Sequence, residues 1–142
     1  MDFQKLVLSI KENEGLKLKP YRCTEGKLTI GYGRNLEHNG ISENEALEML
    51  VNDVVSIKKA LASSLNFERA ISFINLPDHV QNVLVEMAYQ MGVNGLLKFR
   101  KTLSFVKNGQ YEKASIEMLN SKWARQTPNR AKKLSNLMKG GF

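Results

Sequence analysis

Apolar residues recur at helical spacing over most of this chain. Near its start, four apolar residues stand three or four positions apart: Phe3, Leu6, Val7 and Ile10. This spacing predicts an amphipathic helix over residues 2–13. Asp2 can cap the start of that helix, and Gly15 can end it in the left-handed conformation. Glu14 is therefore expected at the C-terminal end of the first helix, where its side chain can project into a neighbouring cleft.

The next segment has the pattern of a β-hairpin. Residues 16–24 and 27–35 are predicted as two short strands joined at Glu25-Gly26, because Gly26 can adopt the dihedral angles of a tight turn. Counting outward from the turn places Cys23 and Thr29 roughly opposite each other. Partners across two strands stand about 5 Å apart at Cβ. The hairpin would therefore hold a thiol and a hydroxyl side by side.

Beyond the hairpin the chain is predicted to be helical. Ser42 and Glu45 form a capping box, and the apolar spacing that follows predicts a long helix over residues 46–64 that joins two lobes. Shorter helices are expected at 67–74, 78–91, 99–108, 111–121 and, opened by Thr127-Pro128, to about residue 139. The predicted fold class is α+β, mostly α.

Composition limits the functional classes. With 142 residues, 42% apolar and 25% charged, the chain is an ordinary globular domain. Its net charge of +7 favours an anionic partner, such as nucleic acid, anionic lipid or cell wall, although solubility alone would also explain it. No apolar run approaches the roughly 18 residues of a membrane span. The start of the chain lacks the pattern of a secretory signal, so we expect synthesis in the cytoplasm.

The residue types argue against several kinds of site. A single cysteine, Cys23, excludes an internal disulfide, and a Cys–His pair needs a histidine that neither His38 nor His79 supplies in any motif. One cysteine and two scattered histidines also give no metal site. Gly31 and Gly33 flank Tyr32 without the further residues of a nucleotide-binding loop. We expect neither a metal nor a cofactor.

Three motifs in register resemble a known family. The run from Glu14 through Cys23 and Thr29 to Gly33 is similar to the catalytic motif of glycoside hydrolase family 24, the phage-type lysozymes or endolysins. Residues 87–92 resemble the aromatic-Gln-x-Gly signature of the central helix in that family. Residues 122–132 are similar to the entry of its C-terminal helix. The resemblance covers nearly the whole chain.

The resemblance implies a two-lobed lysozyme-like fold. A small N-terminal lobe with a β-hairpin would span about residues 14–55. A larger helical lobe would comprise about residues 60–142 together with the first helix, with the substrate cleft between the lobes. The implied activity is that of a muramidase, which hydrolyses the β-1,4 bond between N-acetylmuramic acid and N-acetylglucosamine in peptidoglycan.

The resemblance also implies roles for particular residues. Glu14 would be the general acid, and Cys23 and Thr29 would manage the attacking water or the glycosyl carbon. Arg130 would also lie near Glu14. The residues expected to bind substrate are Tyr89, Gln90, Thr102 and Arg130. The family would further imply a monomer that waits in the host cytoplasm until a holin releases it to the cell wall, without stable membrane insertion and without nucleic acid as a partner.

One departure from the family pattern affects the mechanism. The commonest residue at the position of Cys23 is aspartate, and a thiol cannot accept hydrogen bonds as a carboxylate does. Whether the enzyme inverts or retains the anomeric configuration therefore stays open. The sequence leaves two alternative functions. One is a catalytically silent glycan-binding module, which the intact Glu14 and Thr29 argue against, and the other is a basic helical nucleic-acid binder. Lys58-Lys59 and Lys132-Lys133 are pairs rather than the stripe that the binder would need.

Overall fold

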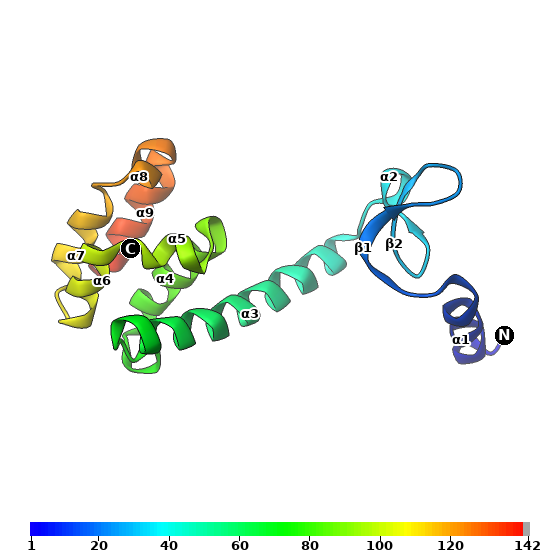
Figure 1. Ribbon diagram of the computed structural model, residues 1–142, viewed down its shortest axis with the longest axis horizontal. Coiled ribbons are helices and arrows are strands. Elements are labelled where there is room, and N and C mark those ends of the chain that lie inside the picture. Colours follow the sequence, from blue (N-terminus) through cyan, green and yellow to red (C-terminus); the bar gives the residue numbers. More distant parts are fainter. Residues whose placement is uncertain (141–142) are drawn as a thin grey trace. The chain divides into compact units, whose positions relative to one another are not determined.

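The computed structural model describes residues 1–140 of the chain, which group into two compact units. The first unit comprises residues 1–49, and the second begins at Leu50. Each unit is described by itself (Figure 1). Together they form an α+β fold that is mostly helical, with one small antiparallel sheet near the N-terminus, as the sequence predicts.

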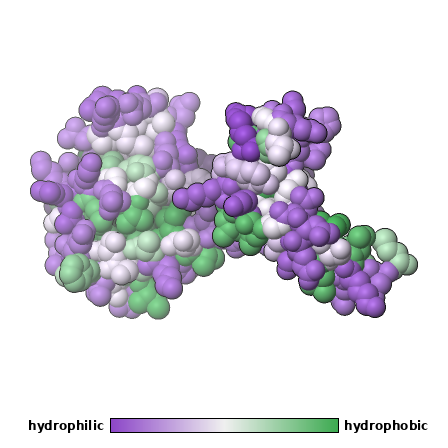
Figure 2. Space-filling view, turned by 45° about the vertical axis from the view of Figure 1, so that its right-hand side comes forward, coloured by the Kyte–Doolittle hydropathy of each residue, from purple (hydrophilic) through white to green (hydrophobic). Residues whose placement is uncertain are grey.

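The first helix follows the local signals closely. Helix α1 spans Phe3–Glu14, one residue beyond the predicted end. The Asp2 carboxylate accepts a hydrogen bond from the Lys5 amide at 3.1 Å, and Gly15 ends the helix at φ +72°. The apolar residues of α1 are exposed, and Figure 2 shows them as interruptions of an otherwise polar surface. Glu14 is the last residue of the helix, as expected.

A three-stranded antiparallel sheet follows, in the order β1-β2-β3. Strand β1 spans Lys17–Arg22, β2 spans Leu28–Gly31 and β3 spans Arg34–Asn35. The single strand predicted over residues 27–35 is therefore wrong. Gly31 and Gly33 adopt φ +71° and φ +79°, which turns the chain back on itself and creates a second hairpin from the expected strand.

A short helix then closes the first unit against its sheet. Helix α2 spans Leu36–Asn39 and carries Glu37 in its first turn. The Glu37 carboxylate accepts hydrogen bonds from the Arg22 guanidinium at 2.7 Å and from the Leu28 amide at 3.0 Å. Because Arg22 also donates to the Gly26 carbonyl at 3.0 Å, these bonds tie α2 to the first hairpin turn.

The long helix α3 spans Glu43–Arg69 and carries the chain from the first unit into the second. Its capping box forms as predicted: Ser42 Oγ accepts from the Glu45 amide at 3.1 Å, and Glu45 Oε1 accepts from the Ser42 amide at 2.8 Å. The helix runs five residues past the predicted end. The separate helix predicted at 67–74 is wrong, because its first turn belongs to α3 and only a 3₁₀ turn, η1 at Phe73–Asn75, follows.

The second unit is a helical bundle. Its remaining helices are α4 (Asp78–Met91), α5 (Val93–Leu97), α6 (Arg100–Lys107), α7 (Tyr111–Met118), α8 (Lys122–Gln126) and α9 (Pro128–Met138). Helices α5 and α8 have five residues each and were not predicted. The expected helix over residues 111–121 ends three residues early, because the Ser121 side chain caps α8 instead.

The core of this unit is built around α4, which contacts both α5 and α9. Five of its residues are buried: Val80, Val83, Leu84, Met87 and Ala88. Helix α7 contacts α6 and α9, and Ser135 donates to the Ser115 carbonyl at 2.8 Å in a buried link between α9 and α7. No helix among the described residues is both long and apolar enough to cross a membrane.

The capping carboxylate of α3 predicts a pH dependence of stability. The guanidinium of Arg34, 2.6 Å away, and then the Ser42 backbone lower the pKa of Glu45 to about 2 from its ordinary 4.5. A carboxyl whose pKa is lowered by folding stabilises the protein above its unfolded pKa, and this stabilisation is lost as the pH falls from 4.5 toward 2. We expect the urea midpoint to drop over that interval.

The substitution Glu45→Gln isolates this contribution, because glutamine can still complete the capping box but cannot titrate. We expect the variant to be less stable at pH 7 and to lose less stability than the wild type between pH 4.5 and pH 2. Parallel pH profiles of the urea midpoint for the two proteins would contradict the assignment.

Candidate active site

The first hairpin brings Cys23 and Thr29 onto one face of the sheet. Thr29 is opposite Tyr21, and Arg22 is opposite Leu28. The prediction that Cys23 stands roughly opposite Thr29 is therefore wrong by two residues, because Cys23 lies level with Lys27. Since Cys23 pairs its amide with the Lys27 carbonyl at 3.0 Å, Cys23 and Thr29 are diagonal neighbours, and diagonal neighbours share a face.

The Cys23 sulfur lies among hydrogen-bond donors. The backbone amide of Lys27, and after it that of Glu25, donates to the sulfur and lowers the pKa of the Cys23 thiol below its ordinary value. Partial burial opposes this effect, the Thr29 hydroxyl adds to it, and the Glu25 carboxylate opposes it. The turn therefore favours a thiolate without a histidine beside it.

Thr29 is the buried member of this pair. It lies on the central strand β2, only 3% exposed, between β1 and β3. Its hydroxyl donates to the Lys27 carbonyl at 2.8 Å, and the same oxygen is within hydrogen-bond reach of the Cys23 sulfur. A hydroxyl has one hydrogen to donate. Thr29 can therefore direct it to the carbonyl or to the sulfur, but not to both.

The Glu14 carboxylate lies against the second turn of the sheet. A Cβ atom added to Gly33 would stand 2.6 Å from Glu14 Oε2, so the carboxylate contacts this backbone only because the residue is glycine. One turn earlier on α1, the Lys11 ammonium lies 5.4 Å from the centre of the Tyr32 ring, a cation–π distance. These two contacts hold the end of α1 at the turn formed by Tyr32 and Gly33.

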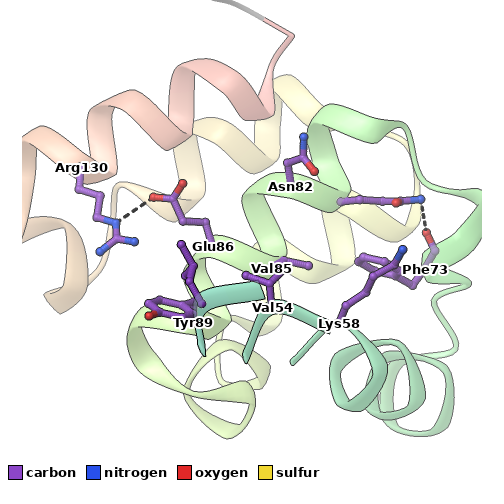
Figure 3. Close-up of a pocket in the computed structure, with 10 residues that line it drawn as sticks. Val54, Lys58, Phe73, Asn82, Val85, Glu86, Tyr89 and Arg130 are labelled. Carbon is purple, nitrogen blue, oxygen red and sulfur yellow. Dashed lines mark hydrogen bonds and ion pairs between the residues drawn. The ribbon is translucent and has the colours of Figure 1, made fainter. Parts of the chain in front are cut away.

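A second set of predicted site residues belongs to the helical unit. Tyr89 and Arg130 line the same cavity of about 610 Å³. In Figure 3, Arg130 points toward Glu86, with Tyr89 beside them and Val54, Val85 and Phe73 forming an apolar wall. Arg130 Nε donates to Glu86 Oε2 at 2.9 Å. Gln81 donates to the carbonyls of Phe73 and Leu76, each at 3.0 Å, which secures η1 at one end of the cavity.

The other two residues of this set, Gln90 and Thr102, take part in the packing of the helical unit. Gln90 Oε1 accepts a hydrogen bond from Trp123 Nε1 at 2.8 Å, which links α4 to α8. The Trp123 ring in turn packs edge-on against Phe99, with the ring centres 6.0 Å apart. Thr102 is only 2% exposed within α6, at the edge of a separate cavity of about 370 Å³.

The structure thus gathers the predicted site residues into two groups. Glu14, Cys23 and Thr29 belong to the first unit, whereas Tyr89, Gln90, Thr102 and Arg130 belong to the second. Within 1–140, no three His, Cys, Asp or Glu side chains gather as metal ligands do. The role predicted for each residue, including the nearness of Arg130 to Glu14, stays a prediction.

Sequence reasoning missed several partners of these residues. Glu86 and Trp123 pair with residues 44 and 33 positions away, and nothing local in the sequence signals such pairs. Gly33 gave a signal, since a glycine in a strand pattern indicates close approach of another group. At Gly33 the group that approaches is the Glu14 side chain.

Comparison with known proteins identifies the class. The phage lysozyme family matches residues 11–139. "Probable T4-type lysozyme 2" of Dictyostelium discoideum is 29% identical over 93% of this chain and 92% of its own length. The "Endolysin" of Acyrthosiphon pisum secondary endosymbiont phage 1 is 25% identical over 89% of this chain and 82% of its own. "Pre-baseplate central spike protein Gp5" of Enterobacteria phage T4 is 28% identical over 93% of this chain, but only 27% of that protein.

The helical α+β fold and these similarities define a glycoside hydrolase of the lysozyme type, a peptidoglycan hydrolase. More narrowly, the chain belongs to the phage lysozyme family, as its three motifs predict.

The contact between Glu14 and Gly33 gives a sharp test of positioning. The substitution Gly33→Ala would place a methyl group 2.6 Å from Glu14 Oε2, so the carboxylate must move. We expect wall-lytic activity to fall by about tenfold or more, because a displacement of about 1 Å at a catalytic group has effects of this size. Turbidity loss of permeabilised cells measures it.

Gly40→Ala is the matched control. Gly40 also has a positive φ, +59°, but nothing lies within 4 Å of its added Cβ, so this variant carries the backbone strain without the clash. Thermal unfolding would show both variants folded. Equal activity losses in the two variants would mean that strain, and not the position of Glu14, explains the effect.

Proposed function

We propose that this protein is a muramidase, which hydrolyses the β-1,4 bond between N-acetylmuramic acid and N-acetylglucosamine. The observation that carries the proposal is the grouping on one small sheet: the Glu14 carboxylate lies at its second turn, and the Cys23–Thr29 pair lies at its first. Glycosidases of this class need one group to protonate the leaving oxygen and another to serve the anomeric carbon or the water that attacks it.

On this proposal Glu14 is the general acid. Its carboxylic acid donates a proton to the glycosidic oxygen as the bond to the anomeric carbon breaks. The contact with Gly33 limits where the carboxyl can lie, and such limits keep a catalytic acid close to the atom that it protonates.

Cys23 and Thr29 serve the other side of the bond. As a thiolate, Cys23 can either accept a proton from the attacking water or bond to the anomeric carbon; the first role gives inversion and the second a covalent intermediate and retention. Thr29, with a hydroxyl that can turn between two acceptors, holds the water or a substrate oxygen. The amides of Lys27 and Glu25 favour the anionic form of the thiol that both roles need.

The helical unit supplies substrate contacts on this proposal. Tyr89 offers an exposed ring edge to a sugar, and Arg130 offers the guanidinium hydrogens that Glu86 does not use. The amide nitrogen of Gln90 and the Thr102 hydroxyl provide further donors. We also propose, from the family resemblance, that the first helix belongs to the larger lobe and that α3 is the helix that connects the two lobes.

We propose a role in cell lysis at the end of a phage cycle. The protein would act as a monomer, accumulate in the host cytoplasm and reach the wall after a holin opens the membrane. The similarity to an endolysin supports this role, and a net charge of +7 suits an anionic wall. Expression with and without a holin, followed by turbidity, tests it: lysis without the holin would contradict the need for release.

The role of Glu14 is tested by Glu14→Gln, which keeps the shape of the side chain and removes the proton. General acid catalysis contributes about 10²- to 10⁴-fold, so lysis of permeabilised cells should fall by that factor. Thermal unfolding should be unchanged, because Glu14 is exposed. Analysis of the products from wild-type digestion should show new reducing muramic acid ends. A folded variant with wild-type activity would refute this mechanism.

Cys23 is tested by a series of three changes. Cys23→Ala removes the thiol and should abolish most activity, whereas Cys23→Asp restores an anionic acceptor and should keep much of it. Because the hydrogen bonds of the turn lower the pKa of the thiol, alkylation should proceed at a lower pH than for a free cysteine, and substrate should protect against it. Full activity of Cys23→Ala would leave Glu14 and a water held by Thr29 to carry the reaction.

A further inference from the structure

The helical unit has a basic pocket away from every residue assigned above. Its volume is about 490 Å³, and it lies where the end of α3 meets α6. Its lining includes Phe67, Glu68, Arg69, Arg100, Ser104 and Lys107. Three of them are cations and one is a carboxylate, so the lining carries a net charge of +2.

One of the three cations is fixed in place. Arg69 Nη2 donates to the Leu97 carbonyl at 2.5 Å, and Nη1 contacts the Glu68 carbonyl at 3.3 Å. Its Nε is buried and has no hydrogen-bond partner in the described part of the chain. A guanidinium held in this way loses little conformational freedom when a ligand binds. Each Nη keeps one hydrogen that these two carbonyls do not use.

Arg100 stands where helix electrostatics disfavours a cation. It is the first residue of α6, whose first turn contains no acidic residue and whose N-terminus has no side-chain cap. The positive end of the helix dipole repels a guanidinium there. The helix N-terminus and the guanidinium together attract an anion. Lys107, in the last turn of the same helix, is at the end where a cation is favoured.

None of the three cations is neutralised by the protein. Among residues 1–140, no ion pair involves Arg69, Arg100 or Lys107, although Glu68 lines the same pocket. Beside them, the Phe67 ring is 90% exposed. Unpaired cations around a hollow, with an exposed ring at its edge, are suited to an anionic group carried on a carbon backbone.

We propose that this pocket binds the phosphate groups of polyol-phosphate polymers attached to bacterial walls. The two guanidinium groups match the geometry of a phosphate, Lys107 adds a point charge, and Ser104 adds a hydroxyl. Phe67 covers the carbon chain or sugar of the next unit. The assignment of the polymer to the wall rests on the proposed function. The affinity of the pocket for phosphodiesters does not depend on that function. The site would hold the enzyme on its insoluble substrate while a separate site cleaves the glycan.

The test measures binding rather than cleavage. The Glu14→Gln protein is incubated with purified walls that keep their phosphate polymer and with the same walls after acid extraction, and the bound fraction is measured by sedimentation. Arg100→Gln with Lys107→Gln removes two exposed cations of the pocket. Lys59→Gln with Lys113→Gln removes the same charge from exposed positions of the same unit that do not line the pocket.

We expect the pocket variant to bind intact walls about tenfold more weakly, the size expected for two exposed ion pairs. The control variant should bind nearly as well as its parent, and the two should bind extracted walls equally. Glu68→Gln removes the one carboxylate and should strengthen binding to intact walls. If binding weakened equally in the pocket and control variants, net charge would explain the effect, and this result would contradict the proposed site.

Soluble probes decide the chemistry of the ligand. Short poly(glycerol phosphate) should bind the parent protein and be weakened by the pocket substitutions. Poly-glutamate of equal charge is the comparison for charge alone, since a guanidinium pairs with carboxylates as well as with phosphates. Stronger pocket-dependent binding of duplex DNA, or of poly-glutamate, would overturn the wall polymer as the ligand. Because the proposed muramidase does not cleave poly(glycerol phosphate), binding of this probe does not depend on whether Glu14 is the catalytic acid.

Discussion

The missing side chain at Gly33 is the constraint on which the geometry of the first unit depends. Because no Cβ occupies that position, the end of α1 can bring the Glu14 carboxylate against the second turn of the sheet. The same positive φ that makes the turn possible also splits the expected strand into β2 and β3. Gly33 therefore shares with Gly31 in forming the second hairpin, and it also sets the location of the candidate acid.

Elements with local signals were predictable from the sequence. The Asp2 cap and the Ser42–Glu45 capping box each satisfy amides within three residues, so the pattern alone located the caps of α1 and α3. The apolar spacing placed the start of α3 at residue 46, three residues later than Glu43. The end of α3 was not predictable in this way. No glycine marks it: Ala70 takes the left-handed conformation instead, at φ +54°, and the Arg69 bond to Leu97, 28 residues away, accompanies it.

The candidate site shows the same difference between residues with local sequence signals and residues whose partners depend on tertiary packing. The motif indicated Glu14, Cys23 and Thr29 because a hairpin brings nearby residues together. The register was wrong by two residues, and since side chains alternate between faces, the thiol and hydroxyl still lie on one face. The partners in the helical unit depend on tertiary packing. The Glu86–Arg130 ion pair and the Trp123–Gln90 hydrogen bond join segments with no local relation in the sequence.

The turn around Cys23 would stabilise an aspartate as well as a thiolate. An aspartate in the same turn would be stabilised as an anion by the amides of Lys27 and Glu25, and these are the groups that lower the pKa of Cys23. These backbone donors therefore favour an anion at this position, whether it is a thiolate or a carboxylate. A thiolate differs in its larger, softer sulfur and in its greater nucleophilicity toward carbon. On the proposed function, the choice between inversion and retention would then depend on how near the anomeric carbon comes to the sulfur, since the turn favours the anionic form in either case.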